Sequence, residues 1–183
     1  MRLTREAVGP DVDIMLDFAV QRDPRRALRA ARLFEPYDPY WIEEPLAGDD
    51  PKALAEFRTA TTARITTGER QAGLRHFRQL LDSRAADVFN PDIAGAGGLL
   101  TMLEIGAMAH AHSVLMSPHS WNSTTVAFLT MLHACAVMPN AIYAELYYDY
   151  LELGNDFSDC DYVIKDGFAS LPQVPGLGVT MNE

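Results

Sequence analysis

Six side chains suited to proton transfer or metal binding recur along the chain at intervals of 23 to 27 residues. They are Asp17, Glu43, Glu69, Asp92, His119 and Glu145. A strand, a helix and two short loops take about 25–40 residues, so each interval is close to one βα unit. The spacing therefore predicts one functional side chain at the same end of each of six consecutive parallel strands. Strands closed into a (β/α)8 barrel would direct these side chains into one cavity.

Local patterns agree with this spacing, because a short run of strand-forming residues leads into each of the six side chains. The predicted strands are 12–16, 40–42, 64–67, 87–90, 114–116 and 141–144. Helical patterns separate the strands, over 74–81, 99–111 and 124–137 and after Asp23 and Asp50. Both aspartates precede a proline, which is typical of a helix N-cap. The pattern indicates an α/β fold of about six βα units, with no clear helix after the last strand.

The regular spacing stops near residue 155, so we expect a partial barrel domain over 1–154 and a C-terminal tail over 155–183. Asp166-Gly167 between two short apolar runs predicts a hairpin in the tail. Gly95 to Gly98 predicts a tight turn and not a phosphate site, because no P-loop or dinucleotide motif accompanies it. Six units are fewer than eight, so the chain either lacks its first two units or forms an open sheet.

Charge and composition exclude several classes of partner. The 183 residues carry a formal net charge of −10, which argues against binding to nucleic acid or to an anionic membrane. The first residues are polar and charged, and no apolar stretch is long enough to span a bilayer, so we expect a cytoplasmic protein. Cys135 and Cys160 form neither a disulfide framework nor a metal motif.

The first three side chains of the series are carboxylates, which suit a divalent cation. Asp17, Glu43 and Glu69 would bring three oxygen donors together, the ligands that Mg²⁺ prefers. Without a cation, three such groups would repel one another. Glu44 is a neighbouring carboxylate, and we expect it to face away from the cavity or to lie at the turn if Glu43 faces inward.

The last three side chains suit proton transfer. His119 lies among turn residues after a predicted strand, and Asp92 would lie one strand earlier, within reach of the imidazole. A carboxylate paired with a histidine fixes its tautomer and raises its basicity. Glu145 would face this base across the cavity. For the other four histidines, which lie in or near helical segments, we expect structural roles.

Seven sequence pieces, in order along nearly the whole chain, carry a resemblance to a known family. They are Val12-Asp-Ile-Met-Leu-Asp17, Trp41-Ile-Glu-Glu-Pro45, Thr67-Gly-Glu69, Asn90-Pro-Asp92 with Gly97-Gly98, Ser117-Pro-His119, Asp166-Gly-Phe168 and Pro175-Gly-Leu-Gly-Val179. The chain resembles the C-terminal barrel part of the enolase superfamily, in the mandelate racemase and muconate lactonizing enzyme group. The resemblance implies that Asp17, Glu43 and Glu69 hold Mg²⁺. It also implies that Asp92 and His119 form the base dyad and that Glu145 hydrogen-bonds the developing enolate.

The implied reaction is Mg²⁺-dependent removal of the proton α to a carboxylate, through an enediolate. Ser117-Pro-His-Ser-Trp121 and the apolar helix after it resemble acid-sugar dehydratases, so dehydration of a small hydroxy-carboxylate is the leading expectation. The alternatives are a sugar-lactone cycloisomerase, a racemase of the same group, or a catalytically inactive fragment. Assembly into a homo-oligomer is expected, because relatives commonly assemble.

Three departures from the family pattern bear on these expectations. Members of the family usually carry a capping domain and two further strands, one with a lysine base, before the part that this chain resembles. We therefore expect barrel strands 3–8 alone, with a tail that in relatives packs toward the capping domain. Ala19 and Gly95 stand where many relatives have polar or basic residues. A two-base racemase would need the lysine, whereas elimination could use His119 first as base and then as acid.

Overall fold

The computed structural model describes residues 1–121, 123–147, 157–160 and 162–182. Strands and helices alternate through most of this chain. The elements before the tail are α1 (Arg2–Val8), β1 (Ile14–Asp17), α2 (Pro24–Phe34), η1 (Glu35–Tyr37), β2 (Pro39–Glu43), α3 (Pro51–Thr59), β3 (Arg64–Thr67), α4 (Gly73–Asp82), β4 (Val88–Phe89), α5 (Ile93–Ala96), α6 (Gly98–Ala111), β5 (Leu115–Met116) and α7 (Thr125–Val137). Those of the tail are β6 (Ser158–Cys160), β7 (Ile164–Lys165), β8 (Phe168–Ala169) and β9 (Val179–Met181).

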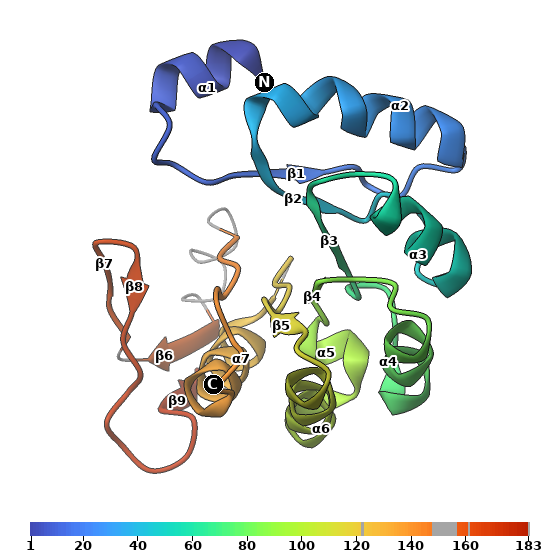
Figure 1. The fold of residues 1–183 in the computed structure, drawn as a ribbon. Helices are drawn as coiled ribbons and strands as arrows, with labels where there is room; N and C mark the ends of the chain where they lie inside the picture. The colour runs from blue at the N-terminus through green and yellow to red at the C-terminus, as the bar shows by residue number, and fades with distance from the viewer. Residues whose placement is uncertain (122, 148–156, 161, 183) are drawn as a thin grey trace.

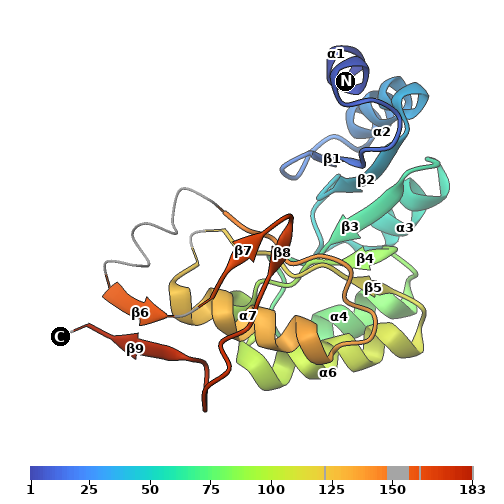
Figure 2. The same cartoon turned by 90° about the vertical axis from the view of Figure 1, so that its left-hand side faces the viewer.

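The first five strands form one parallel sheet in the order of the sequence, β1-β2-β3-β4-β5. The sheet curves as an arc, and α2, α3, α4 and α6 follow one another around its outer side (Figure 1). Turning the molecule shows β1 and β2 at one end and the tail at the other, with the β7–β8 hairpin over α7 (Figure 2). The structure confirms the predicted α/β fold and the partial barrel.

Helix starts follow the capping pattern of the sequence. The Asp23 side chain accepts hydrogen bonds from the N–H groups of Arg25 and Arg26, and the Asp50 side chain accepts one from Ala53 N–H. A proline follows each aspartate, where it costs no helical hydrogen bond. The caps therefore fix where α2 and α3 begin, and with them the length of the loops that follow β1 and β2.

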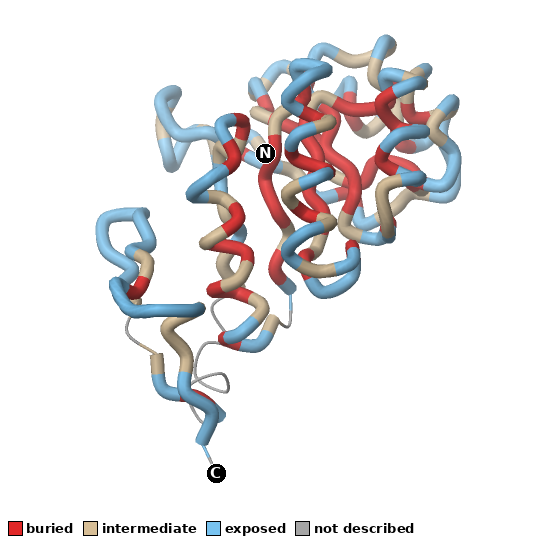
Figure 3. The backbone as a smooth tube through the Cα atoms, turned by 90° about the horizontal axis from the view of Figure 1, so that it is seen from below, coloured by how far each residue is buried: buried red, intermediate tan, exposed pale blue. Residues whose placement is uncertain are grey.

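The core lies between the sheet and its helices (Figure 3). Strand residues Ile42, Ile65 and Phe89 are fully buried, and on the helix side Phe77 and Met102 are as well. Phe77 and Phe89 pack edge to face with ring centroids 5.2 Å apart. Burying each of these side chains contributes about 1.5–3 kcal/mol. No helix of the described ranges is long and apolar enough to cross a membrane.

The segment 141–144, predicted as the sixth strand, runs beside β5 without forming a strand. Met116 N–H donates to Asn140 O and Ile142 N–H donates to Met116 O, both at 2.9 Å. This is a parallel pairing, but a single bridge between Met116 and Ala141 is all that forms. The next N–H donor on the side of β5 would be residue 118, but Pro118 has no N–H, and it is Glu145 N–H that donates to Pro118 O, at 3.2 Å. The prediction of a sixth strand is therefore correct in the position of the segment and wrong in its secondary structure.

The glycine-rich segment also differs from its prediction. Gly95 lies inside the short helix α5, and only Gly97 and Gly98, with φ of 125° and 85°, have the positive φ of a turn. The reason is that the Asp92 side chain accepts hydrogen bonds from the N–H groups of Ala94 and Gly95 and so caps a helical turn. Gly97 alone therefore joins α5 to α6, and Gly98 is the first residue of α6.

The tail contains the predicted hairpin. β7 and β8 pair antiparallel through a two-residue turn, in which Asp166 and Gly167 both have positive φ, as a type I′ turn requires. β6 and β9 form a second antiparallel pair. The proposed boundary between barrel and tail, at 154/155, lies outside the described residues.

Candidate active site

The six side chains of the series lie at one end of the sheet, after the carboxyl ends of its strands. Asp17 ends β1 and pairs in register with Glu43, which ends β2. Glu69 follows β3 by two residues. Asp92 and His119 follow β4 and β5 and form a parallel bridge with each other. Parallel strands thus bring residues that are far apart in the sequence to the same edge of the sheet.

Asp92 orients the imidazole of His119. Its Oδ2 lies 3.0 Å from His119 Nδ1, while its Oδ1 accepts the two N–H groups at the start of α5. The other ring nitrogen, Nε2, lies 3.5 Å from Glu69 Oε2 and 3.8 Å from Glu145 Oε2. One nitrogen of His119 is therefore fixed by the half-buried carboxylate of Asp92, and the other faces two more carboxylates.

The surroundings of His119 and Asp92 favour a positively charged imidazole beside a negatively charged aspartate. Burial lowers the pKa of His119, but the hydrogen bond to Asp92 and the charges of Glu145 and Glu69 outweigh it and raise this pKa overall. Burial raises the pKa of Asp92, but the hydrogen bond with His119 and those from Gly95 and Ala94 lower it overall. The imidazole is therefore more basic than usual and the aspartate more acidic, as a base with an orienting carboxylate requires.

Glu43 is the most strongly perturbed carboxyl at the site. Burial, followed by the negative charges of Asp17, Glu145 and Glu69, raises the pKa of Glu43 to about 8. Asn90 Nδ2 donates a hydrogen bond of 2.8 Å to Glu43 Oε1. A nearby cation would remove the repulsion that raises this pKa. The electrostatics thus fit a site that gains from binding a cation.

The three predicted metal ligands are neighbours, but they do not converge on one point. Asp17 Oδ1 accepts the N–H of Ala19 at 2.7 Å, and Glu69 Oε1 pairs with Arg70 Nε at 3.1 Å. Within the ranges that the structure describes, no three His, Cys, Asp or Glu side chains gather closely enough to hold a metal ion. The donor set itself, three carboxylates on adjacent strand ends, fits the oxygen preference of Mg²⁺. The residues match the ion in chemistry, while each carboxylate has a protein partner.

Glu145 borders the site opposite the three predicted metal ligands, Tyr147 follows it by two residues, and Trp121 follows its hydrogen-bond donor Ser120. Glu145 Oε2 accepts the N–H of Ser120 at 2.7 Å, and its side chain is 44% exposed. Trp121 is 57% exposed and packs edge to face on Tyr147 with ring centroids 6.4 Å apart. A polar edge with the exposed Trp121 ring beside it suits a small polar ligand with apolar C–H faces.

Two residues of the site had no assigned role from the sequence, Asn90 and Glu44. Asn90 is signalled only by its place in the Asn-Pro-Asp92 piece. Glu44 is expected at the turn or facing away from the cavity, and it does lie at the turn, but it is fully buried. Its Oε1 accepts hydrogen bonds from Thr67 Oγ1 and Gly68 N–H, and burial raises its pKa despite these bonds. No pattern in the sequence separates this buried carboxylate from a solvated one.

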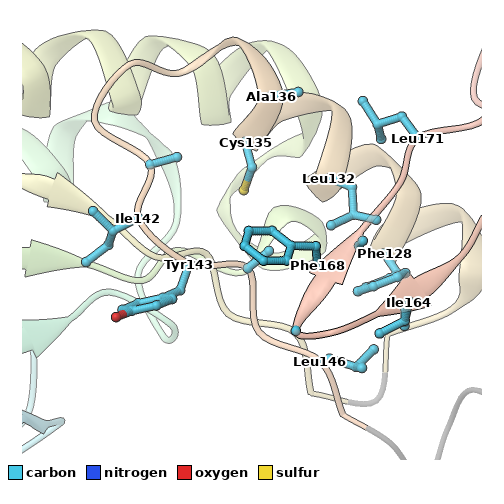
Figure 4. Close-up of a pocket in the computed structure, with 14 residues that line it drawn as sticks. Phe128, Leu132, Cys135, Ala136, Ile142, Tyr143, Leu146, Ile164, Phe168 and Leu171 are labelled. Carbon is cyan, nitrogen blue, oxygen red and sulfur yellow. The ribbon is translucent and has the colours of Figure 1, made fainter. Parts of the chain in front are cut away.

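An apolar pocket of about 620 Å³ lies between α7, the β7–β8 hairpin and the segment that contains Ala144 and Leu146 (Figure 4). Phe128, Leu132 and Phe168 line it, and none of the six strand-end side chains does. Cys135 also lines it, but burial raises the pKa of this thiol to about 12, so it is protonated at neutral pH. The pocket is lined by apolar side chains, whereas the side chains suited to proton transfer or metal binding lie at the strand ends.

Comparison with known proteins shows what the chain is similar to. The D-gluconate dehydratase of Thermoproteus tenax is 34% identical over 98% of this chain and 36% of its own length. The L-rhamnonate dehydratase of Saccharopolyspora erythraea is 32% identical over 100% of this chain and 47% of its own length. The chain thus spans less than half the length of these relatives.

Solved structures share the fold as well. An enolase from Sargasso Sea environmental sequencing has a TM-score of 0.94 and 38% identity, over 99% of this chain and 48% of that one. A mandelate racemase/muconate lactonizing enzyme from Jannaschia sp. CCS1 has a TM-score of 0.90 and 31% identity, over 97% and 45%. The family model described as enolase C-terminal domain-like matches residues 1–183. The chain therefore belongs to the enolase superfamily, in the mandelate racemase and muconate lactonizing enzyme group.

Proposed function

We propose that this chain carries the proton-transfer site of a Mg²⁺-dependent dehydratase acting on an acid sugar. The observation that carries the proposal is the arrangement of His119, with Nδ1 held by Asp92 and Nε2 facing Glu69 and Glu145. The relatives support the class of substrate, because they are named as dehydratases of gluconate and rhamnonate.

Asp17, Glu43 and Glu69 would hold the ion. When bound, Mg²⁺ supplies positive charge that offsets the charge developing on the substrate carboxylate. Asn90, which donates to Glu43 Oε1, would keep that side chain directed at the site. Such outer hydrogen bonds orient metal ligands in general.

His119 would act first as base and then as acid. Asp92 accepts the Nδ1 proton, so the lone pair of Nε2 is free to take the proton from the carbon α to the carboxylate. The electrons of the broken C–H bond form a double bond to the β-carbon, and the β-hydroxyl leaves with the proton that Nε2 returns, giving water. The enol product then becomes a ketone. A protonated Glu145 carboxyl would donate a hydrogen bond to the enolate oxygen while that oxygen carries negative charge.

The test is formation of a keto acid from a panel of D-gluconate, D-galactonate and L-rhamnonate with Mg²⁺. We expect turnover of at least one acid by the wild-type chain and loss of at least a thousandfold in His119→Asn, as for removal of a catalytic base. His112→Asn is the matched control, because His112 lies at the exposed end of α6. Failure of every acid, or equal rates in His119→Asn and wild type, would contradict the proposal. Isomerisation without loss of water would favour a racemase or cycloisomerase.

A further inference from the structure

One residue outside the ligand and base sets joins three strand ends of the site. Glu44 follows β2 directly and has a positive φ of 42°. Its N–H donates to Thr66 O on β3, and its C=O accepts the N–H of Val20, which follows β1, both at 2.9 Å. The peptide groups of Glu44 thus extend the links between the strands beyond the end of the sheet ladder.

The side chain of Glu44 adds a second link to β3. Its Oε1 accepts Thr67 Oγ1 at 2.7 Å and Gly68 N–H at 2.9 Å, and both Glu44 and Thr67 are fully buried. Gly68 has φ of 140°, and a Cβ there would lie 2.9 Å from Phe77 Cε1. The turn that presents Glu69 is therefore tight, glycine-dependent and tied to a buried carboxylate.

We propose that Glu44 is a positioning residue, which holds the Thr67-Gly68 turn so that Glu69 stays in reach of Asp17 and Glu43. The inference rests on the proposed function, because it assumes that these three carboxylates hold Mg²⁺. Because Glu44 is fully buried, it would contact neither ion nor substrate itself. Its effect is transmitted through two hydrogen bonds to the residues directly before Glu69.

Two variants distinguish the effect of where the Glu44 oxygen lies from the effect of its negative charge. Glu44→Gln keeps an acceptor oxygen at the same reach and removes the charge, whereas Glu44→Asp keeps the charge and shortens the side chain by one methylene. A positioning role predicts that Glu44→Asp raises the Kd for Mg²⁺ by about 10–100-fold, the usual loss for an outer hydrogen-bond partner of a metal ligand. Glu44→Gln should stay within about threefold of wild type. Glu104→Gln, on the exposed face of α6, is the control for loss of one negative charge.

Amide hydrogen exchange gives a readout without metal. The Gly68 N–H should exchange faster in Glu44→Asp than in wild type and remain protected in Glu44→Gln, because its acceptor is lost in the first variant alone. If Glu44→Asp does not fold, Thr67→Val and Thr67→Ser test the same link, since valine removes the hydroxyl donor and serine keeps it. We expect weaker Mg²⁺ binding by calorimetry in Thr67→Val than in Thr67→Ser.

The outcomes distinguish this inference from the proposed function. Wild-type protein that binds no Mg²⁺ would contradict the proposed function, while the Gly68 exchange pattern still decides whether Glu44 holds the turn. Equal protection of Gly68 in Glu44→Asp and wild type would overturn the positioning role. Loss of Mg²⁺ affinity in Glu44→Gln as large as in Glu44→Asp would overturn it too, because charge and not position would then matter.

Discussion

Replacing Asp92 by asparagine should prevent His119 from acting as a base while leaving the fold intact. The two N–H groups at the start of α5 lie 2.9 and 3.1 Å from Asp92 Oδ1, and an asparagine oxygen can accept both, since asparagine caps helices about as well as aspartate. The other position of the side chain, 3.0 Å from His119 Nδ1, would then hold an NH₂ group. Two donors cannot face each other, so the His119 proton moves to Nε2. The nitrogen that should accept the substrate proton is then already protonated.

The same change of tautomer in another enzyme with a histidine base costs about 10⁴-fold in kcat, equivalent to about 5.5 kcal/mol of transition-state stabilisation. We expect a loss of that size for Asp92→Asn in keto acid formation, with a change in unfolding free energy below about 1 kcal/mol. Asp50→Asn, the same substitution at the N-cap of α3, is the control and should keep full activity. Activity of Asp92→Asn above a tenth of wild type, with unchanged thermal stability, would show that Asp92 does not set the tautomer of His119.

Two further predictions concern stability. Asp87 accepts hydrogen bonds from Arg58 Nε at 2.8 Å and from the N–H of Ile65 at 2.9 Å. Asp87→Ala should therefore lower the free energy of unfolding, measured in urea, by about 1–3 kcal/mol, and Asp87→Asn should lower it by less. Equal losses in the two variants would contradict this prediction. The hydrogen bond from Thr62 N–H lowers the pKa of Glu35, and its stabilising effect is present above the unfolded-state pKa and lost as pH falls through the folded-state value. Glu35→Gln should therefore lessen the fall in stability on acidification, measured by thermal unfolding between pH 6 and about 3, and an unchanged slope would count against it.

The fold could be predicted from the sequence because a repeated chemical feature marks repeated structure. The intervals between Asp17, Glu43 and Glu69 match the length of a βα unit, so the positions of the strand ends can be predicted from the number of residues between them. Aspartate before proline marks the start of α2 and α3 for an equally local reason, since the cap is formed by residues within one turn.

What could not be predicted depends on contacts between distant residues. Glu44 differs from Glu43 only by its backbone conformation, and its burial depends on Thr67 and Gly68, more than 20 residues later. Whether 141–144 forms a strand depends on the N–H groups of the segment beside it, where Pro118 has none. Such features follow from register and tertiary packing, and a local pattern contains neither.

In the proposed reaction, His119, oriented by Asp92, removes a proton from the carbon α to a carboxylate. Exchange of that proton with solvent deuterium, followed by NMR on an acid sugar in D₂O with Mg²⁺, measures this step without requiring loss of water. We expect exchange with wild-type protein and none above background with His119→Asn. Absence of exchange with wild type, or equal exchange with the variant, would contradict this proposal.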